Sequence, residues 1–241
     1  MIPKIIHYCW FGSAIKPGYF FKCYKSWVKF FPGFEILEWN ESNTDLSHPF
    51  LQEAVRQEKW AFLSDFVRIQ KLLEKGGVYL DTDMLFVKQL EVSLLDYQFF
   101  IGMENSNSLS AGVIGIEKDH LIMSNLLDVY NGLVFDKFEE VIIPGILNKY
   151  FSSKVAGKLI PGNVLGGIIL PYMVFYPLPF KLKDFHYRKF LREDTIAVHL
   201  WAGSWIDNEN KSFFNRLLSF VKFNLSRFYI PSSFISFSRN I

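Results

Sequence analysis

Two carboxylates stand two residues apart in VYLDTD, residues 78–83. The apolar residues 78–80 predict a buried strand, and Asp81 and Asp83 at its end point to the same side if the strand stays extended. Such a pair suits a hard divalent cation, which keeps coordination positions open for the phosphates of a nucleotide diphosphate. Asp-x-Asp pairs also occur by chance on loops, so the neighbouring residues must decide.

Asp65 and Arg68 lie three residues apart on the helix predicted before this strand. Side chains at that spacing share a helix face, where they commonly form a surface ion pair of little consequence. The turn at Gly76-Gly77 folds the helix directly back onto the Asp81 strand. A buried Asp65–Arg68 pair would therefore face the same pocket and hydrogen-bond sugar hydroxyls, and both interpretations stay open.

A second polar group follows a predicted strand near the C-terminus, in HLWAGSW, residues 199–205. A lone histidine on a strand is more often a satisfied core residue than a ligand. Here the hydroxyl of Ser204 and the indole N–H of Trp205 follow His199, and both are suited to a metal shell or a diphosphate. Trp10 closes the first predicted strand, where an aromatic ring is either ordinary core or a platform for a base.

The elements that position these residues alternate between strand and helix. The hydrophobic pattern predicts strands at 2–10, 34–39, 78–83 and 197–201, and helices at 18–30, 49–59, 62–73 and 119–130. This order predicts a mixed α/β sheet flanked by helices, with ligands at the carboxyl ends of its strands. The uncharged residues 159–180 contain prolines and glycines that would break a membrane-spanning helix, so they predict short buried strands and turns.

Composition limits the class of protein. The 241 residues are 50% hydrophobic and 21% charged, which fits one large domain and excludes a disordered chain or a disulfide-stapled miniature. Residues 208–241 hold five basic residues and one acidic residue, a balance of +4 that leaves −2 for residues 1–207 of a chain with net charge +2. A body so near neutrality predicts no general nucleic-acid binding. Cys9 and Cys23 have no metal-type spacing and predict a reducing compartment, and no signal peptide is expected.

The C-terminal residues 208–241 differ in kind from the rest and predict an amphipathic helical tail after a body of residues 1–207. One helical stripe of apolar residues, with basic residues at its borders, ends at Pro231; its members are Leu217, Leu218, Val221, Leu225 and Phe228. This pattern is typical of a helix docked on the body or of a helix lying on an anionic membrane surface. Both alternatives stay open.

Four segments together resemble a known family: IPKIIHYCW near the start, SDFVR, GGVYLDTD and HLWAGSW. They are similar to the DXD-containing glycosyltransferase sugar-binding family, which includes Golgi initiating mannosyltransferases and bacterial capsular polysaccharide glycosyltransferases. The resemblance extends more distantly to the glucosyltransferase domains of large clostridial toxins. It covers the chain from Ile2 to about Trp205, and its central block is specific, because SDxxR, GGxYxD and DxD rarely coincide at this spacing.

The resemblance implies a GT-A type fold with a Rossmann-like mixed sheet, a nucleotide-sugar donor, Mn²⁺ or Mg²⁺, and retention of anomeric configuration. It implies that Trp10 stacks on the base and that the donor sugar is held by Asp65 and Arg68. The implied catalytic residues are Asp65, Arg68 and Asp83; the implied metal ligands are Asp81, Asp83 and His199; the remaining donor contacts are Tyr79, Asp81, Ser204 and Trp205. Glu104, Asn105 and Asn107 fall on the expected acceptor side.

The function expected from this resemblance is transfer of a hexose from a nucleotide sugar to a glycan acceptor. A UDP-sugar is favoured as donor over GDP-mannose, and the acceptor is expected to be lipid-linked, in surface or capsular polysaccharide synthesis at the cytoplasmic face of the cell membrane. An aspartate-based phosphatase is an alternative, although its Asp pair normally lies on the first strand. A non-catalytic membrane-associated binding protein is the other alternative, which the intact Asp81 and Asp83 disfavour.

Overall fold

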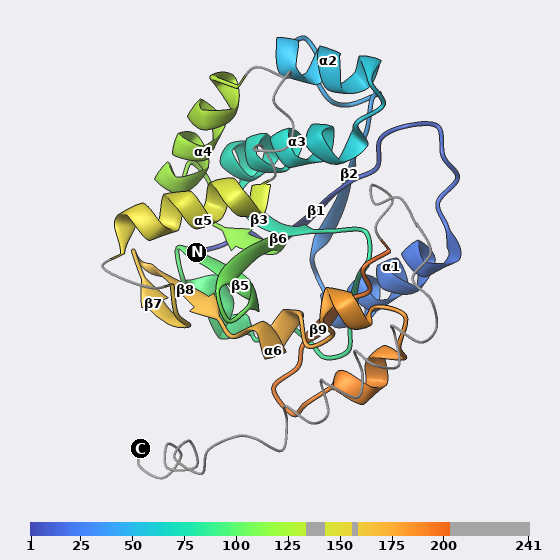
Figure 1. Ribbon diagram of the computed structural model, residues 1–241, viewed down its shortest axis with the longest axis vertical. Coiled ribbons are helices and arrows are strands. Elements are labelled where there is room, and N and C mark those ends of the chain that lie inside the picture. Colours follow the sequence, from blue (N-terminus) through green and yellow to red (C-terminus); the bar gives the residue numbers. More distant parts are fainter. Residues whose placement is uncertain (134–142, 156–158, 203–241) are drawn as a thin grey trace.

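A seven-stranded mixed sheet forms the centre of the computed structural model, which describes residues 1–133, 143–155 and 159–202 (Figure 1). The strand order is β2-β1-β3-β6-β5-β8-β7, and a separate two-stranded sheet pairs β4 with β9. The strands are β1 (Ile5–Cys9), β2 (Glu35–Trp39), β3 (Gly77–Leu80), β4 (Met84–Phe86), β5 (Phe99–Asn105), β6 (Ser108–Ile116), β7 (Gly162–Val164), β8 (Gly167–Leu170) and β9 (Ala197–His199).

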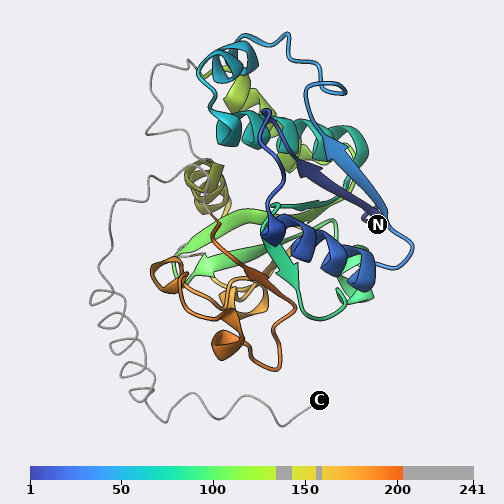
Figure 2. The same cartoon turned by 90° about the vertical axis from the view of Figure 1, so that its right-hand side faces the viewer.

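Helices cover both faces of the large sheet (Figures 1 and 2). The α-helices are α1 (Gly18–Phe30), α2 (Pro49–Arg56), α3 (Trp60–Lys75), α4 (Leu121–Asn131), α5 (Ile143–Lys154) and α6 (Tyr172–Phe175), and the short 3₁₀ turns are η1 (Val92–Asp96), η3 (Phe180–Leu182) and η4 (Tyr187–Phe190). Apolar side chains of α2 to α5 pack in one core layer, and those of α1, α6, β4 and η1 pack in the other. The predicted mixed α/β sheet flanked by helices is confirmed.

Most of the predicted elements are present, some with shifted ends. The helix at 18–30 is confirmed in full, and the helix predicted at 49–59 ends at Arg56, because Glu58 adopts a left-handed φ of 54° that a helix cannot continue through. The helix expected from residue 119 begins at Leu121, where the His120 ring caps it by accepting from the Ile122 N–H. Residues 159–180 form short strands and turns as predicted, with α6 in addition, but only β8 is buried, whereas β7 at the sheet edge is largely exposed. No helix of the described residues is long and apolar enough to cross a membrane.

The extension of the third strand through Asp83 is wrong. β3 ends at Leu80 and the chain then turns, because the Met84 N–H donates back to the Asp81 carbonyl at 3.0 Å. Likewise β1 spans only Ile5–Cys9, and β9 ends at His199 rather than at Trp201. Asp81 and Asp83 therefore lie on the turn after β3, where side chains do not have to alternate between the two faces of the sheet.

Parallel pairing brings the ends of the first strands to one edge of the sheet. β1 pairs in parallel with β2 and with β3, so the segments after Cys9, Trp39 and Leu80 leave the sheet on the same side. The helix α3 returns onto β3 through Gly77, which has φ +106. A Cβ there would lie 2.6 Å from the Ile5 carbonyl oxygen, so this close return requires glycine.

His7 is a structural residue of this sheet. Its side chain is fully buried; its Nδ1 lies 3.1 Å from the Trp39 indole nitrogen and its Nε2 lies 2.7 Å from the Gly76 carbonyl oxygen. Because an indole N–H can only donate, Nδ1 accepts and Nε2 carries the single proton. Burial, with the nearby charges of Lys75 and Lys71, lowers the pKa of His7 to about 4.

Neutral His7 makes folding sensitive to acid. Between the unfolded pKa of 6.5 and the folded value of about 4, the unfolded chain binds the extra proton, so this contribution to stability falls as the pH falls. We expect a loss of about 3 kcal/mol across that window. Denaturant unfolding at stepped pH should show it, and His7→Gln, which keeps a donor and an acceptor, should lack it. An NMR titration that places the His7 pKa near 6.5 would contradict the prediction.

Candidate active site

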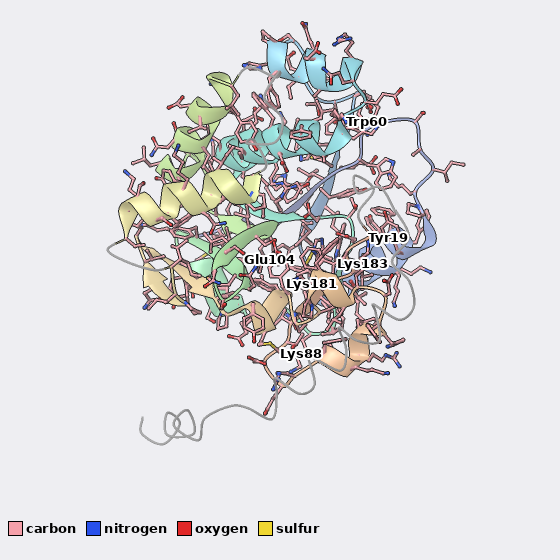
Figure 3. All side chains as sticks on the ribbon, viewed as in Figure 1. Tyr19, Trp60, Lys88, Glu104, Lys181 and Lys183 are labelled. Carbon is pink, nitrogen blue, oxygen red and sulfur yellow. The ribbon has the colours of Figure 1, made fainter. Side chains whose placement is uncertain are left out.

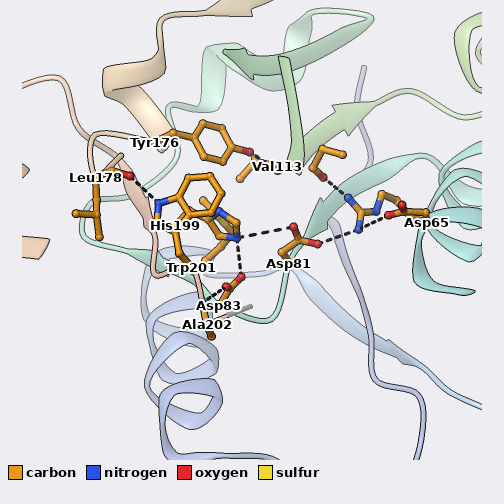
Figure 4. A network of polar contacts seen from close by, with 12 residues as sticks. Asp65, Asp81, Asp83, Val113, Tyr176, Leu178, His199, Trp201 and Ala202 are labelled. Atoms are coloured by element: carbon orange, nitrogen blue, oxygen red, sulfur yellow. Dashed lines mark hydrogen bonds and ion pairs between the residues drawn. The ribbon is translucent and has the colours of Figure 1, made fainter. Parts of the chain in front are cut away.

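The turn after β3 brings two carboxylates to one histidine (Figure 4). Asp83 Oδ1 lies 2.9 Å from His199 Nε2, and Asp81 Oδ2 lies 4.0 Å from the same nitrogen. One ligand atom from each of these residues falls within 4.8 Å of the others. Asp81, Asp83 and His199 thus form a compact acidic and imidazole cluster, which we call the DDH cluster.

Pairing of β4 with β9 holds the DDH cluster together. Met84 and His199 are partners in this antiparallel pair. Asp83 also anchors the chain that follows β9: its carbonyl accepts from Leu200 N–H at 3.0 Å, and its Oδ2 accepts from Ala202 N–H at 2.9 Å. Trp201 adopts a left-handed φ of 54°, an uncommon conformation for such a residue, and this turn brings Ala202 back to Asp83.

Opposite charges stabilise the Asp83–His199 pair. Burial alone would raise the pKa of Asp83, but the charge and hydrogen bond of His199 and the Ala202 N–H outweigh it and lower that pKa. Burial would lower the pKa of His199, but Asp83 and then Asp81 and Glu104 raise it. Asp83 thus keeps its negative charge, which is the state that binds a cation.

Arg68 connects the DDH cluster to α3. Its side chain is 5% exposed, and its guanidinium lies 2.9 Å from Asp81 Oδ1 and 3.1 Å from Asp65 Oδ1. It also donates to the Ala111 carbonyl at 2.7 Å, and its central carbon lies 4.1 Å from the centre of the Tyr79 ring. The predicted proximity of Asp65 and Arg68 to the Asp81 strand is therefore present, as a buried network rather than a surface pair.

Asp65 lies at the inner end of this network. Burial raises its pKa to about 7, against the lowering effect of Arg68. Its Oδ2 accepts from the backbone N–H of Ile143 at 3.4 Å. Arg68 therefore compensates a buried carboxyl group on one side and orients the Asp81 carboxylate on the other.

The other predicted donor contacts lie around this centre. Trp10 follows β1, is partly exposed, and donates its indole N–H to the Ala14 carbonyl at 3.0 Å, with its ring against Phe20. Tyr79 is 2% exposed, so its ring supports Arg68 from within the core. Ser204 and Trp205 lie outside the described residues, as does the tail of residues 208–241.

The predicted acceptor-side residues have different surroundings in the structure. Glu104 near the end of β5 is partly buried, which raises its pKa, and the charge of His199 opposes that shift. Figure 3 shows its position with that of Tyr19 at the start of α1. Asn105 instead serves its own turn, accepting from Asn107 N–H and donating to Ser108 Oγ.

Several residues at the site were not identified from the sequence. Tyr176 packs its ring 5.9 Å from that of His199, and its hydroxyl accepts from Val113 N–H at 2.9 Å. Ala111 and Ala202 contribute backbone groups alone, which no side-chain pattern reveals. Tyr19 at the start of α1 has its pKa raised by burial and by the negative charge of Asp83.

The donor set of the DDH cluster fits a divalent cation. Two carboxylates and an imidazole within 4.8 Å form a mixed oxygen and nitrogen set. His199 also has a buried Nδ1 with no hydrogen-bond partner among the described residues, so its orientation is set by the Nε2 side that faces the carboxylates. A cation inserted among these atoms would replace the direct Asp83–His199 contact.

Comparisons with known proteins agree with this geometry. Residues 17–100 match the family described as "Glycosyltransferase sugar-binding region containing DXD motif". Lactosylceramide 4-alpha-galactosyltransferase of Homo sapiens is 26% identical over 151 residues, which are 58% of this chain and 41% of that protein. The enzyme of the same name from Rattus norvegicus is 26% identical over 173 residues, 66% of this chain and 46% of that protein. The chain thus spans less than half the length of these relatives.

The fold has a counterpart among solved structures. The structure titled "PaToxG Glycosyltransferase" superposes with a TM-score of 0.50 at 17% identity, covering 64% of this chain and 70% of that one. This likeness concerns the fold alone, and it agrees with the GT-A resemblance. Asp81-Thr82-Asp83 lies inside the matched region. The Asp81–Asp83 pair thus falls in the part of the chain that matches the family of glycosyltransferase sugar-binding regions containing the DXD motif.

Proposed function

We propose that this chain is a metal-dependent glycosyltransferase that moves a hexose from a nucleotide sugar to a glycan acceptor. The observation that carries the proposal is the DDH cluster, in which the two carboxylates of the matched DXD region meet His199 at the end of β9. A UDP-sugar is the favoured donor and GDP-mannose the other candidate. The matched galactosyltransferases support a hexose as the transferred group.

A divalent cation fits this site as Mn²⁺ or Mg²⁺, held by Asp81, Asp83 and His199. Bound there, it would supply positive charge to the diphosphate that leaves the donor. Mn²⁺ is favoured because the site combines carboxylates with an imidazole, whereas Mg²⁺ is usually held by carboxylates, phosphates and water.

The residues of the chain then have separate tasks. Arg68 keeps Asp81 oriented and compensates the negative charge of Asp65, so the site is preorganised before the donor binds. Trp10 offers its ring to the base. Positive charge at the site would stabilise the leaving diphosphate, so no separate acid is needed. We propose that a phosphate oxygen of this leaving group accepts the proton of the acceptor hydroxyl. Because the acceptor would then attack on the face from which the diphosphate departs, the configuration of the sugar is retained.

The acceptor is proposed to be lipid-linked, in surface or capsular polysaccharide synthesis. Glu104, Asn105 and Asn107 form the acceptor side in this proposal. The basic amphipathic residues 208–241, which lie outside the described part of the chain, are proposed to attach to an anionic membrane surface. This arrangement would place the enzyme at the cytoplasmic face of the cell membrane.

A thermal-shift titration with UDP and with GDP, each with Mn²⁺ and with chelator, tests the proposal. One nucleotide should raise the melting temperature only in the presence of metal, since a ligand at a hundredfold its dissociation constant stabilises by about 2.7 kcal/mol. In Trp10→Ala the affinity for that nucleotide should fall by about 1–3 kcal/mol, as expected for a lost stacking platform. A folded protein that responds to neither nucleotide would refute the proposal and favour a phosphatase or a non-catalytic binding protein.

A further inference from the structure

The outer side of α1 has an unusual combination of side chains. Its inner side is buried through Phe20, Cys23 and Trp27, as expected for a helix packed on a core. On the outer side, Phe21 is 51% exposed and Val28 is 57% exposed. Scattered exposed apolar residues are ordinary, so these two indicate an interaction surface only in combination with the residues around them.

Lysines surround these apolar side chains. Lys22, Lys25 and Lys29 are exposed on the same side of the helix, and the sequence of α1 contains no acidic residue. We call this surface, made of Phe21, Lys22, Lys25, Val28 and Lys29, the α1 outer face.

The positive charge continues onto a neighbouring segment. Lys22 Nζ lies 4.6 Å from the centre of the Tyr187 ring, which places η4 beside α1. The next residue, Arg188, is exposed, and η4 likewise contains no acidic residue. The face thus combines four exposed cations with large apolar side chains, the composition of a helix that lies at a membrane interface.

Charge selects among the possible occupants of this face. The tail of residues 208–241 carries a balance of +4, so the lysines would repel it. A second copy of the chain would bring the same lysines to both sides of a symmetric contact. An anionic bilayer offers the opposite charge to the lysines and an apolar layer to Phe21 and Val28.

We propose that the α1 outer face docks onto an anionic lipid bilayer, with Phe21 and Val28 entering the boundary between headgroups and acyl chains. Docking here would fix the orientation of the site, since α1 is tied to β4: the Trp27 indole donates to the Met84 carbonyl at 2.7 Å and Ser26 Oγ accepts from Phe86 N–H at 3.0 Å. This surface is separate from the tail, and the proposal does not depend on the sugar-transfer chemistry.

A fluorescent reporter distinguishes this face from the tail. The environment-sensitive dye NBD would be attached at Val28→Cys, with Ser152→Cys on α5, in the opposite core layer, as the matched control; Cys9 and Cys23 are buried and should label poorly. On vesicles of phosphatidylcholine mixed with phosphatidylglycerol, we expect a blue shift at position 28 and none at position 152. Vesicles of phosphatidylcholine alone should produce no blue shift at either position.

A charge variant supplies the second measurement. The triple variant K22Q/K25Q/K29Q should lower the partition coefficient onto the mixed vesicles by roughly 10- to 100-fold. The control K118Q/K149Q/K154Q removes the same charge from exposed lysines elsewhere and should bind like the parent. Equal binding by the two triple variants would overturn the proposal, as would a parent that does not bind the mixed vesicles.

Two outcomes of the reporter would also overturn the proposal. A label at position 28 that stays in water while the protein sediments with vesicles would show that another surface, such as the tail, makes the contact. A label that is blue-shifted before vesicles are added would show that the tail or a second copy already covers the face.

Discussion

Replacing Asp83 by asparagine is expected to reduce sugar transfer by about 100- to 1,000-fold or more while the protein stays folded. The amide side chain would keep an oxygen to accept from Ala202 N–H, so the turn should survive. It would lack the negative charge that pairs with His199 and that a cation requires. The loss of transfer activity is measured as release of nucleotide diphosphate from the donor. The loss of metal affinity is measured as Mn²⁺ binding by calorimetry.

Asp119→Asn is the matched control for this prediction. Asp119 is exposed and has φ 57°, a conformation that asparagine also tolerates, and it lies outside the DDH cluster. We expect this variant to keep the activity, metal affinity and melting temperature of the parent. Full transfer activity in Asp83→Asn would remove Asp83 from the mechanism.

The largest effect on stability is expected from Arg68→Gln. This change leaves Asp65 and Asp81 without their shared cation, and Asp65 is only 7% exposed. Removing one partner of a buried pair typically costs about 3–5 kcal/mol, because the remaining charge is uncompensated. Denaturant unfolding measures this loss, and we expect transfer activity to fall with it.

Two further variants test whether the loss of stability in Arg68→Gln comes from the buried, uncompensated charge. Arg56 forms a similarly spaced pair with Glu53, but its side chain is 70% exposed, so Arg56→Gln should change the free energy of unfolding by less than about 0.5 kcal/mol. Removing both buried partners, in Asp65→Asn with Arg68→Gln, should cost less than the sum of the two single changes. Strict additivity would show that the pair contributes nothing beyond packing.

The sequence predicted those parts of the fold whose signals are local. The helix at 18–30 has a clear apolar face, and the glycines at 76 and 77 mark the return onto β3. β4 is only three residues long, too short for a periodic pattern, and it exists because it pairs with the distant β9. α5 contains Pro144 and Gly145 near its start, residues typical of a turn, and it was not predicted.

The site was predictable in its side chains and not in its supports. The spacing of Asp81, Asp83, Asp65 and Arg68 marked them as candidates, and all four lie in one network. The sequence left open whether the Asp65–Arg68 pair is buried, because burial depends on β6 and Tyr79 packing around it. Hydrogen bonds to the Ala111 and Ala202 backbone depend on tertiary structure alone.

The pairing of β4 with β9 also determines when the site can form during synthesis. Asp81 and Asp83 leave the ribosome early, whereas His199 and Ala202 come more than a hundred residues later. Until then the carboxylates have only Arg68 as a cationic partner from the network described above. Release of nearly the whole body must therefore precede assembly of the DDH cluster, so a nascent chain stalled before residue 197 would contain every strand of the seven-stranded sheet but would lack β9 and the His199 imidazole.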